Sequence, residues 1–141
     1  MQLEVKINLI LHATENERKI LEVLEKFLDI EQKNFQIEHV SGHFNNPILL
    51  ISSKLKKKNA QNFVKLFFSK MKEDDFQEIF DNVEDYVTSS GLNLRINKQK
   101  LILENLEISK EDTIKINIST PVYIKNETKM IYQELMKMGF N

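Results

Sequence analysis

Two histidines, each followed two residues later by a hydroxyl side chain, are the first candidates for chemistry in this 141-residue chain. They form the triplets His12-Ala13-Thr14 and His39-Val40-Ser41. Such a pair would cleave a phosphodiester with one imidazole as base and the other as acid, while the hydroxyls bind the phosphate. The triplets are only 27 residues apart, however, and both hydroxyls also fit structural roles, as a helix cap and a turn residue. A two-histidine phosphoesterase is therefore the lesser alternative, and we expect no catalytic residue.

A second group of notable residues lies between Ser41 and Gln61. A glycine turn with a His-Phe pair precedes a short apolar segment, and a lysine cluster follows it. An exposed ring can stack on an unpaired base, and lysines can neutralise phosphates. This interpretation predicts RNA binding through His43, Phe44, Asn46, Lys54, Lys56, Lys57, Lys58, Arg95, Lys98, Gln99 and Lys100.

The same stretch also has a purely structural interpretation. Gly42 and Asn45 would supply turn conformations, Phe44 would pack into the core, and the lysines would be solvated. Lysines at the start of a helix oppose the helix dipole, however, which favours a use for their charge. RNA binding is the preferred interpretation for this reason, and the structural one stays open.

The composition disfavours most other functional classes. The chain has no cysteine, which excludes disulfides, thiolate nucleophiles and Cys-ligated zinc. No acid shares a metal-ligand spacing with the three histidines, and no phosphate-binding glycine loop is present, so neither a metal nor another cofactor is expected. No apolar run approaches the roughly 20 residues that span a bilayer. We expect a cytoplasmic protein without a membrane partner.

A net charge of −1 conceals a strong segregation along the chain. Residues 54–72 contain seven lysines and no acid, whereas residues 73–85 contain seven acids and no base. This division either gives one positive and one negative surface or leaves two solvated helix faces that partly neutralise each other. The acidic segment could dock a protein partner or a second copy of the chain, so an interaction subunit or homodimer remains an alternative to RNA binding.

Hydrophobic periodicity predicts the elements that position these residues. Alternation predicts strands over 2–12, 35–40, 48–55, 92–96 and 114–118. Helical spacing predicts helices over 15–29, 59–70 and 74–85, and a terminal helix that Gly139 stops. Thr14 and Glu17 form a capping box, and 101–108 fits either a helical turn or a strand.

The order of these elements predicts an α+β fold, with a mainly antiparallel sheet and helices packed on one face. We expect a single RNA-binding-like domain over 1–141, in which 121–141 is a C-terminal helical extension. We also expect Lys54–Lys58 and Arg95–Lys100 to share one face of the sheet, and His12 and His39 not to share a pocket.

Three blocks of sequence carry a resemblance to a known family. They are LHATENERKILEVL (11–24), GHFNNPILLISSKLKKK (42–58) and LRINKQKLILENLEI (94–108). In this order they resemble an archaeal family of small predicted RNA-binding proteins, also described as predicted exosome subunits. The resemblance implies a fold like that of the ribosomal protein that binds 5S RNA, a non-catalytic RNA-binding function, and exosome or other RNA-processing proteins as partners. Asn45, Asn97 and Glu104 depart from the Gly, Asp and Gly that are usual in the family.

Overall fold

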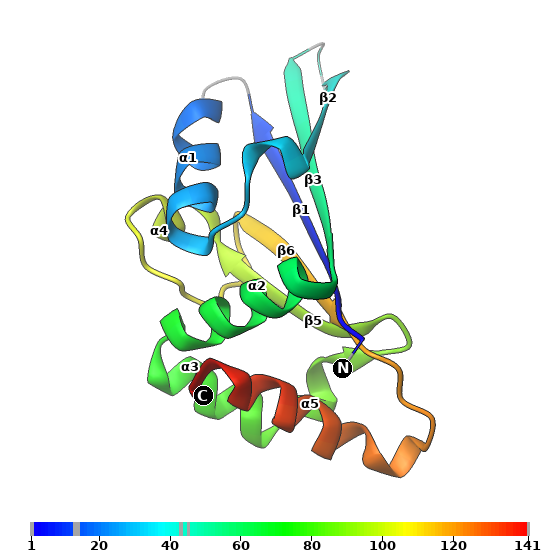
Figure 1. Ribbon diagram of the computed structural model, residues 1–141. Helices are drawn as coiled ribbons and strands as arrows, with labels where there is room; N and C mark the ends of the chain where they lie inside the picture. The colour runs from blue at the N-terminus through cyan, green and yellow to red at the C-terminus, as the bar shows by residue number, and fades with distance from the viewer. Residues whose placement is uncertain (1, 13–14, 43, 45, 141) are drawn as a thin grey trace.

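The computed structural model describes residues 2–12, 15–42, 44 and 46–140. It has two layers, a six-stranded sheet and a set of helices that pack against one side of it (Figure 1). The strand order is β2-β3-β1-β6-β5-β4, and every neighbouring pair is antiparallel. The predicted α+β class, with an antiparallel sheet covered on one face, is confirmed.

The elements agree closely with the periodicity of the sequence. The strands are β1 (Glu4–His12), β2 (Phe35–Ser41), β3 (Pro47–Lys56), β4 (Val87–Thr88), β5 (Gly91–Asn97) and β6 (Thr113–Ser119). The α-helices are α1 (Glu17–Leu28), α2 (Lys57–Lys70), α3 (Glu73–Asp81), α4 (Lys98–Ile102) and α5 (Thr128–Lys137). Short 3-10 turns are η1 (Gln32–Asn34), η3 (Val83–Tyr86), η4 (Lys125–Glu127) and η5 (Met138–Phe140). Among the strands and α-helices of the described residues, β4 and α4 were not predicted, although α4 overlaps the start of the 101–108 segment, which was left open between a helical turn and a strand.

The alternation along β1 divides the sheet into a buried face and an open face. Val5, Ile7 and Leu9 are at most 3% exposed and form part of the core. Lys6 and Asn8 project from the opposite side of the strand and are exposed. The paired strands β5 and β6 repeat this alternation in register, so the division extends across the sheet. The face turned away from the helices is called the open face below.

The buried face is covered chiefly by α2. Its side chains Phe63, Phe67 and Phe68 are almost fully buried, with neighbouring ring centroids 5.2 Å apart. Burial of each ring contributes roughly 2–3 kcal/mol to the free energy of unfolding. Gln133 of α5 donates a hydrogen bond to the carbonyl of Phe80, which attaches the terminal helix to the segment after α2.

The start of α1 differs from the prediction. The helix begins at Glu17, and its N-cap is Asn16, whose side chain accepts a hydrogen bond from the backbone N–H of Lys19. Asn16 is an equally suitable cap type. Thr14, the predicted cap, lies outside the described residues.

The end of α5 lies where the sequence predicted it. The helix ends at Lys137, and Gly139 lies in the following η5 turn. A Cβ at Gly139 would lie 2.8 Å from the backbone nitrogen of Ser69 in α2. Gly139 therefore follows the C-cap residue Met138 at the predicted C′ position, and it also permits a close approach between η5 and α2. Met130, predicted to be buried, is 55% exposed.

Candidate nucleic-acid interface

Two adjacent rows of side chains on the open face concentrate basic and amide groups. The first row runs across β3, β1, β6 and β5 and contains Ser52, Asn8, Lys115 and Arg95. The second row crosses the same strands and contains Lys54, Lys6, Asn117 and Asn93. Side chains directly opposite one another in such rows have Cβ atoms about 4.5–5.5 Å apart. The eight residues therefore form one continuous surface, called the basic patch below.

The basic patch places like charges side by side. Lys6 is opposite Lys54, and Arg95 is opposite Lys115. Glu4 compensates the first pair, since its carboxylate lies 3.4 Å from Nζ of Lys54 and 3.9 Å from Nζ of Lys6. No carboxylate of the described residues lies within 4.0 Å of the cationic groups of Arg95 or Lys115. Like charges at opposed positions destabilise a sheet, and an anionic ligand would relieve this repulsion.

Two hollows lie beside the basic patch on the open face. The larger, of about 640 Å³, is lined by polar residues that include Asn8, Gln36 and Lys115, by one acid, Glu38, and by apolar residues that include Ile10 and Leu50. The smaller, of about 280 Å³, is lined by residues that include Lys6 and Lys54. Ammonium, amide and hydroxyl groups of this kind bind phosphate and ribose oxygens in protein–nucleic acid complexes.

Three of the predicted RNA contacts share the open face. Lys54 and Lys56 alternate on β3 with buried residues, and Arg95 occupies the equivalent side of β5. These three residues therefore share one face of the sheet, as expected.

Lys57 and Lys58 lie at the lower end of the sheet, because β3 passes directly into α2 without a loop (Figure 1). Lys57 has a φ of 54°, which is uncommon for a residue other than glycine. The first turn of α2 has no acidic residue and no side-chain cap. Both lysines line a groove of about 890 Å³ at this end of the sheet.

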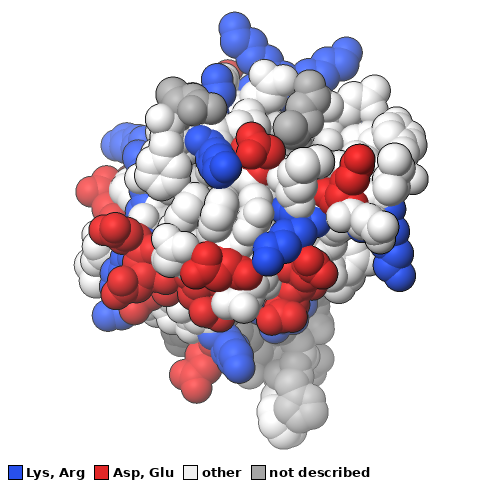
Figure 2. Space-filling view, turned by 90° about the horizontal axis from the view of Figure 1, so that it is seen from below, with Lys and Arg blue, Asp and Glu red and all other residues white. Residues whose placement is uncertain are grey.

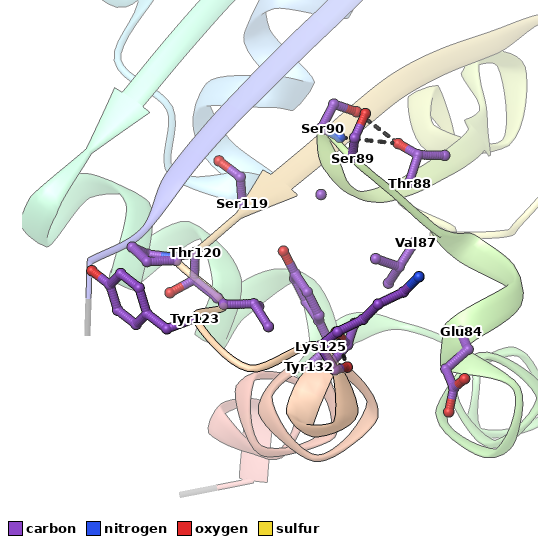
Figure 3. A pocket seen from close by; sticks show the side chains of 14 residues that line it. Glu84, Val87, Thr88, Ser89, Ser90, Ser119, Thr120, Tyr123, Lys125 and Tyr132 are labelled. Carbon is purple, nitrogen blue, oxygen red and sulfur yellow. Dashed lines mark hydrogen bonds between the residues drawn. The ribbon is translucent and has the colours of Figure 1, made fainter.

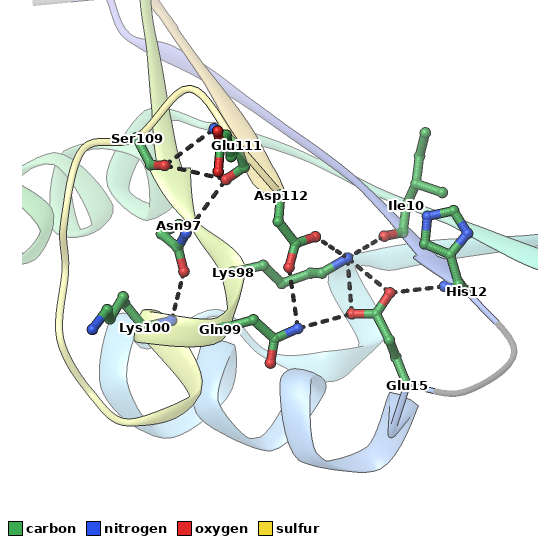
Figure 4. A network of polar contacts seen from close by, with 10 residues as sticks. All are labelled: Ile10, His12, Glu15, Asn97, Lys98, Gln99, Lys100, Ser109, Glu111 and Asp112. Atoms are coloured by element: carbon green, nitrogen blue, oxygen red, sulfur yellow. Dashed lines mark hydrogen bonds and ion pairs between the residues drawn. The ribbon is translucent and has the colours of Figure 1, made fainter.

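Lys98 is buried, which corrects its assignment as an RNA contact. Its ammonium lies 2.9 Å from the carboxylate of Glu15 and 3.1 Å from that of Asp112 (Figure 4). It also donates a hydrogen bond to the carbonyl of Ile10 at 2.7 Å. The side chain is only 2% exposed, and a buried ammonium of this kind depends on its partners. Lys98 joins β1 to the segments that precede α1 and β6, and it is not accessible to a phosphate.

The neighbours of Lys98 belong to the same network. Gln99 donates hydrogen bonds to the carboxylates of Glu15 and Asp112 at 3.2 and 3.1 Å. Burial acts to raise the pKa of Asp112, but hydrogen bonds from Lys98 and Gln99, with the charges of Lys98 and His12, outweigh it and hold this pKa below its usual value.

Asn97 caps α4 by accepting a hydrogen bond from the backbone N–H of Lys100. Asn at this position therefore keeps the capping role that the Asp of the related family would fill. Lys100 is exposed, but α4 follows the end of β5, whereas α2 begins level with the start of β5 (Figure 1). Lys98–Lys100 and Lys56–Lys58 thus do not form one surface, contrary to the prediction.

The connection between β2 and β3 places an aromatic ring in solvent. Phe44 is 85% exposed and has a φ of 58°, and Asn46 beside it is exposed. The alternative in which Phe44 packs into the core is therefore wrong. His43 and Asn45 lie outside the described residues. The ten residues of β3 rise about 3.4 Å each, so roughly 30 Å separates this turn from Lys56, and the predicted placement of the lysines beside the ring is not found.

His12 and His39 face opposite sides of the sheet. His12 is in register with Ile48 and therefore lies on the open face, whereas His39 is opposite Leu49 and lies on the other face. The two imidazoles do not converge on one phosphate, as predicted.

Sequence reasoning missed Lys6 and Lys115, which complete the basic patch. Both occupy outward positions of alternating strands, as do Asn8, Asn93 and Asn117. Their shared face was readable from the alternation, but their proximity depends on the pairing of β1 with β6 and of β6 with β5.

Metal-binding clusters and membrane-spanning helices are both missing from the described residues. Among them, no group of three or more His, Cys, Asp and Glu side chains is arranged to hold a metal ion. In the same part of the chain, no helix has the length and apolar character needed to cross a bilayer.

Comparison with known sequences agrees with the chemistry of this surface. The model of a protein family described as "RNA binding" matches residues 4–120. RNA-binding protein PAB1135 of Pyrococcus abyssi is 29% identical over 126 residues, which cover 84% of this chain and 82% of that protein. Uncharacterized protein MJ0213 of Methanocaldococcus jannaschii is 29% identical over 116 residues, which cover 78% of each chain.

Solved structures share the fold. Mth689, a DUF54 protein from Methanothermobacter thermautotrophicus, is 24% identical with a TM-score of 0.76, over 96% of this chain and 99% of its own. SSO0741 from Sulfolobus solfataricus, also of DUF54, is 24% identical with a TM-score of 0.75, over 94% of this chain and 96% of its own.

Proposed function

This chain belongs to the archaeal family described as RNA binding, and from that premise we propose that it binds RNA through the basic patch on its open face. The observation that carries the proposal is the pairing of Arg95 with Lys115. Among the described residues, no carboxylate lies within 4.0 Å of either cation, and two opposed cations of this kind favour an anionic partner. The patch supplies four cations with amide and hydroxyl groups between them.

The chemistry of the open face favours contacts to the RNA backbone. None of the side chains that the described strands present on this face is Phe, Tyr or Trp. Base stacking therefore has no platform there, whereas cations and amides can bind phosphates and 2′-hydroxyls. Double-stranded RNA presents both groups across its shallow minor groove, so we infer that the open face binds an RNA duplex.

The exposed turn between β2 and β3 supplies a separate contact in this proposal. Phe44 would stack on an unpaired base, with Asn46 as a hydrogen-bonding neighbour. Because the turn lies at one end of β3 and Lys56 at the other, the two contacts would reach different parts of one RNA.

The proposal is tested with a blunt RNA duplex of about 16 base pairs, the length that a typical double-stranded RNA-binding domain spans. In the wild type, the logarithm of the affinity should fall linearly with the logarithm of the salt concentration. The double variant Arg95→Gln/Lys115→Gln should lower the slope by roughly 0.7–0.9 for each phosphate that the protein no longer neutralises, and should weaken all duplex sequences about equally.

The matched control is Lys26→Gln, an exposed lysine of α1 in the helix layer. It should retain the wild-type affinity and slope. An unchanged slope in the double variant would remove the basic patch as the RNA site.

The second candidate function is docking of a protein, including a component of exosome-type RNA-processing machinery. Figure 2 shows a band of acidic side chains across the end of the molecule where α3 and α5 lie. The first turn of α3 contributes Glu73, Asp74 and Asp75, and η3 contributes Glu84 and Asp85. If the wild-type protein binds no RNA even at low salt, this acidic band becomes the better candidate for the functional surface.

A further inference from the structure

Two adjoining hollows lie at the lower end of the sheet, away from the exposed turn at Phe44. One has a volume of about 890 Å³ and is bordered by the end of β3 and the start of α2. The other has a volume of about 820 Å³ and is bordered by the segment before α5 (Figure 3). Both are lined by Ser89, Ser90 and the 119–121 segment, so they share a wall and form one groove.

The two halves of this groove differ in charge. The first half is lined by Lys56, Lys57 and Lys58, with Glu4 as its one acid, and Glu4 already pairs with Lys54 and Lys6. This half has an excess of positive charge and suits phosphate groups.

The second half is neutral and aromatic. Its lining includes one base, Lys125, and one acid, Glu84. Tyr132 lies at its inner side, where burial raises the pKa of the phenol, and Tyr123 lies at its rim with 90% of its surface exposed. An exposed tyrosine ring provides a stacking surface for any nucleobase.

The wall between the halves is made of hydroxyl side chains and is connected to the basic patch. The hydroxyl groups of Thr88 and Ser90 are 2.9 Å apart and hydrogen-bonded. Asn117, a member of the basic patch, donates hydrogen bonds to the carbonyl and the hydroxyl of Ser90 at 3.2 and 3.3 Å. Lys56 lies on the open face, next to Lys54 of the basic patch along β3, and it also lines the groove. A strand of a nucleic acid bound on the basic patch could therefore continue into the groove.

We infer that this groove holds a single-stranded segment of RNA that extends from a duplex on the open face. Its phosphates lie against Lys56, Lys57 and Lys58, and a base stacks on Tyr123. The inference rests on the proposed function for the duplex part of the ligand. The stacking side of the groove comes from residues after 120, outside the region that the family model matches.

The test compares the blunt duplex with the same duplex carrying a single-stranded tail of about four nucleotides, at the 3′ end or at the 5′ end, by fluorescence anisotropy. In the wild type, a tail of one polarity should raise the affinity about tenfold, as expected for one stacked base with its phosphate contacts. Tyr123→Ala should lose this gain and should bind the blunt duplex as the wild type does. Lys57→Gln/Lys58→Gln should also lose the gain, measured as the ratio of its affinities for the tailed and the blunt duplex.

Two controls accompany these variants. Tyr123→Phe keeps the ring and should keep the gain, and Lys26→Gln removes a lysine elsewhere and should have no effect. Because Tyr123 is 90% exposed, its replacement leaves the core intact.

Each remaining outcome decides between the two proposals. A wild-type protein that binds the blunt duplex but gains nothing from either tail overturns the groove inference and leaves the proposed function in place. A tail effect that survives Tyr123→Ala also overturns it. Binding of AMP without a tail effect would assign the groove to free nucleotides instead. Failure to bind either duplex overturns both proposals.

Discussion

At the scale of single residues, the network around Lys98 explains part of the sequence that resembles the family. Glu15 comes from the first block and Lys98 and Gln99 from the third, and they meet although 83 residues separate Glu15 from Lys98. These side chains bind one another and hold β1 against α4. A buried lysine could not be recognised from the sequence, because a lysine beside other polar residues usually lies at the surface.

Replacing Lys98 by Ala should lower the free energy of unfolding by about 3 kcal/mol, because it leaves Glu15 and Asp112 without their buried counter-charge. Urea denaturation measures the loss. Lys26→Ala, at an exposed position, is the control and should change the free energy by less than about 0.5 kcal/mol.

The pH dependence of this loss separates charge from packing. In the wild type the folded pKa of Asp112 is lowered, so its carboxylate contributes stability above the unfolded pKa of about 4, and this contribution is lost as the pH falls. In the variant, the interactions with Lys98 that lower the pKa of Asp112 are absent. Between about pH 5 and pH 3 the wild type should therefore lose stability more steeply than the variant. Parallel profiles would show that Lys98 acts through packing alone.

Phe44→Ala should weaken RNA binding by about 1–3 kcal/mol if the ring stacks on a base. The salt slope should stay unchanged, because the ring neutralises no phosphate. The free energy of unfolding should change by less than about 0.5 kcal/mol, since the side chain is 85% exposed. RNA titrations at several salt concentrations measure both quantities, with Phe44→Tyr as the variant that keeps a stacking ring. Unaltered affinity in Phe44→Ala would exclude the turn from the interface.

At the scale of elements, the predictions succeeded where the hydrophobic pattern continues over many residues. The nine residues of β1 alternate without interruption on their buried side, and the twelve of α1 repeat an apolar stripe. The missed elements are short: β4 has two residues and α4 has five. Segments of this length contain too few repeats for a period to be visible, and their conformation depends on contacts with distant residues.

Helix ends were harder to predict because capping residues occur close together in the sequence. The start of α1 illustrates this, since Thr14 was predicted as its cap and Asn16 is the N-cap. Gly139 follows the end of α5 as predicted, and it also permits contact with α2. Gly139→Ala should lower the free energy of unfolding by about 1–3 kcal/mol, because the new Cβ must displace backbone atoms of Ser69. Thermal or urea unfolding measures this, with Lys129→Ala, at an exposed position of α5, as the control. An unaffected stability would mean that η5 does not pack against α2 in solution.

At the scale of the whole molecule, the candidate site could be predicted only in part. The cluster from Lys54 to Lys58 was evident because its members are contiguous, and the structure divides it between the open face and the groove. Lys6 and Lys115 lie near opposite ends of the chain and meet Lys54 and Arg95 only through strand pairing. The alternation along each strand predicts which residues point outward, but it does not predict the order of the strands in the sheet. The basic patch could therefore be identified only from the structure.

The strand order has a consequence for how the protein is made. β1 leaves the ribosome first, yet it pairs on one side with β6, and the register places Glu4 opposite Ser119. Contacts between such distant residues form slowly, since a long loop must close before they can stabilise the chain. During synthesis, β1 can pair early with β3, while its other edge remains unsatisfied until β6 has emerged. Until β6 has been synthesised, the nascent chain therefore exposes an open sheet edge, and such unpaired edges favour aggregation.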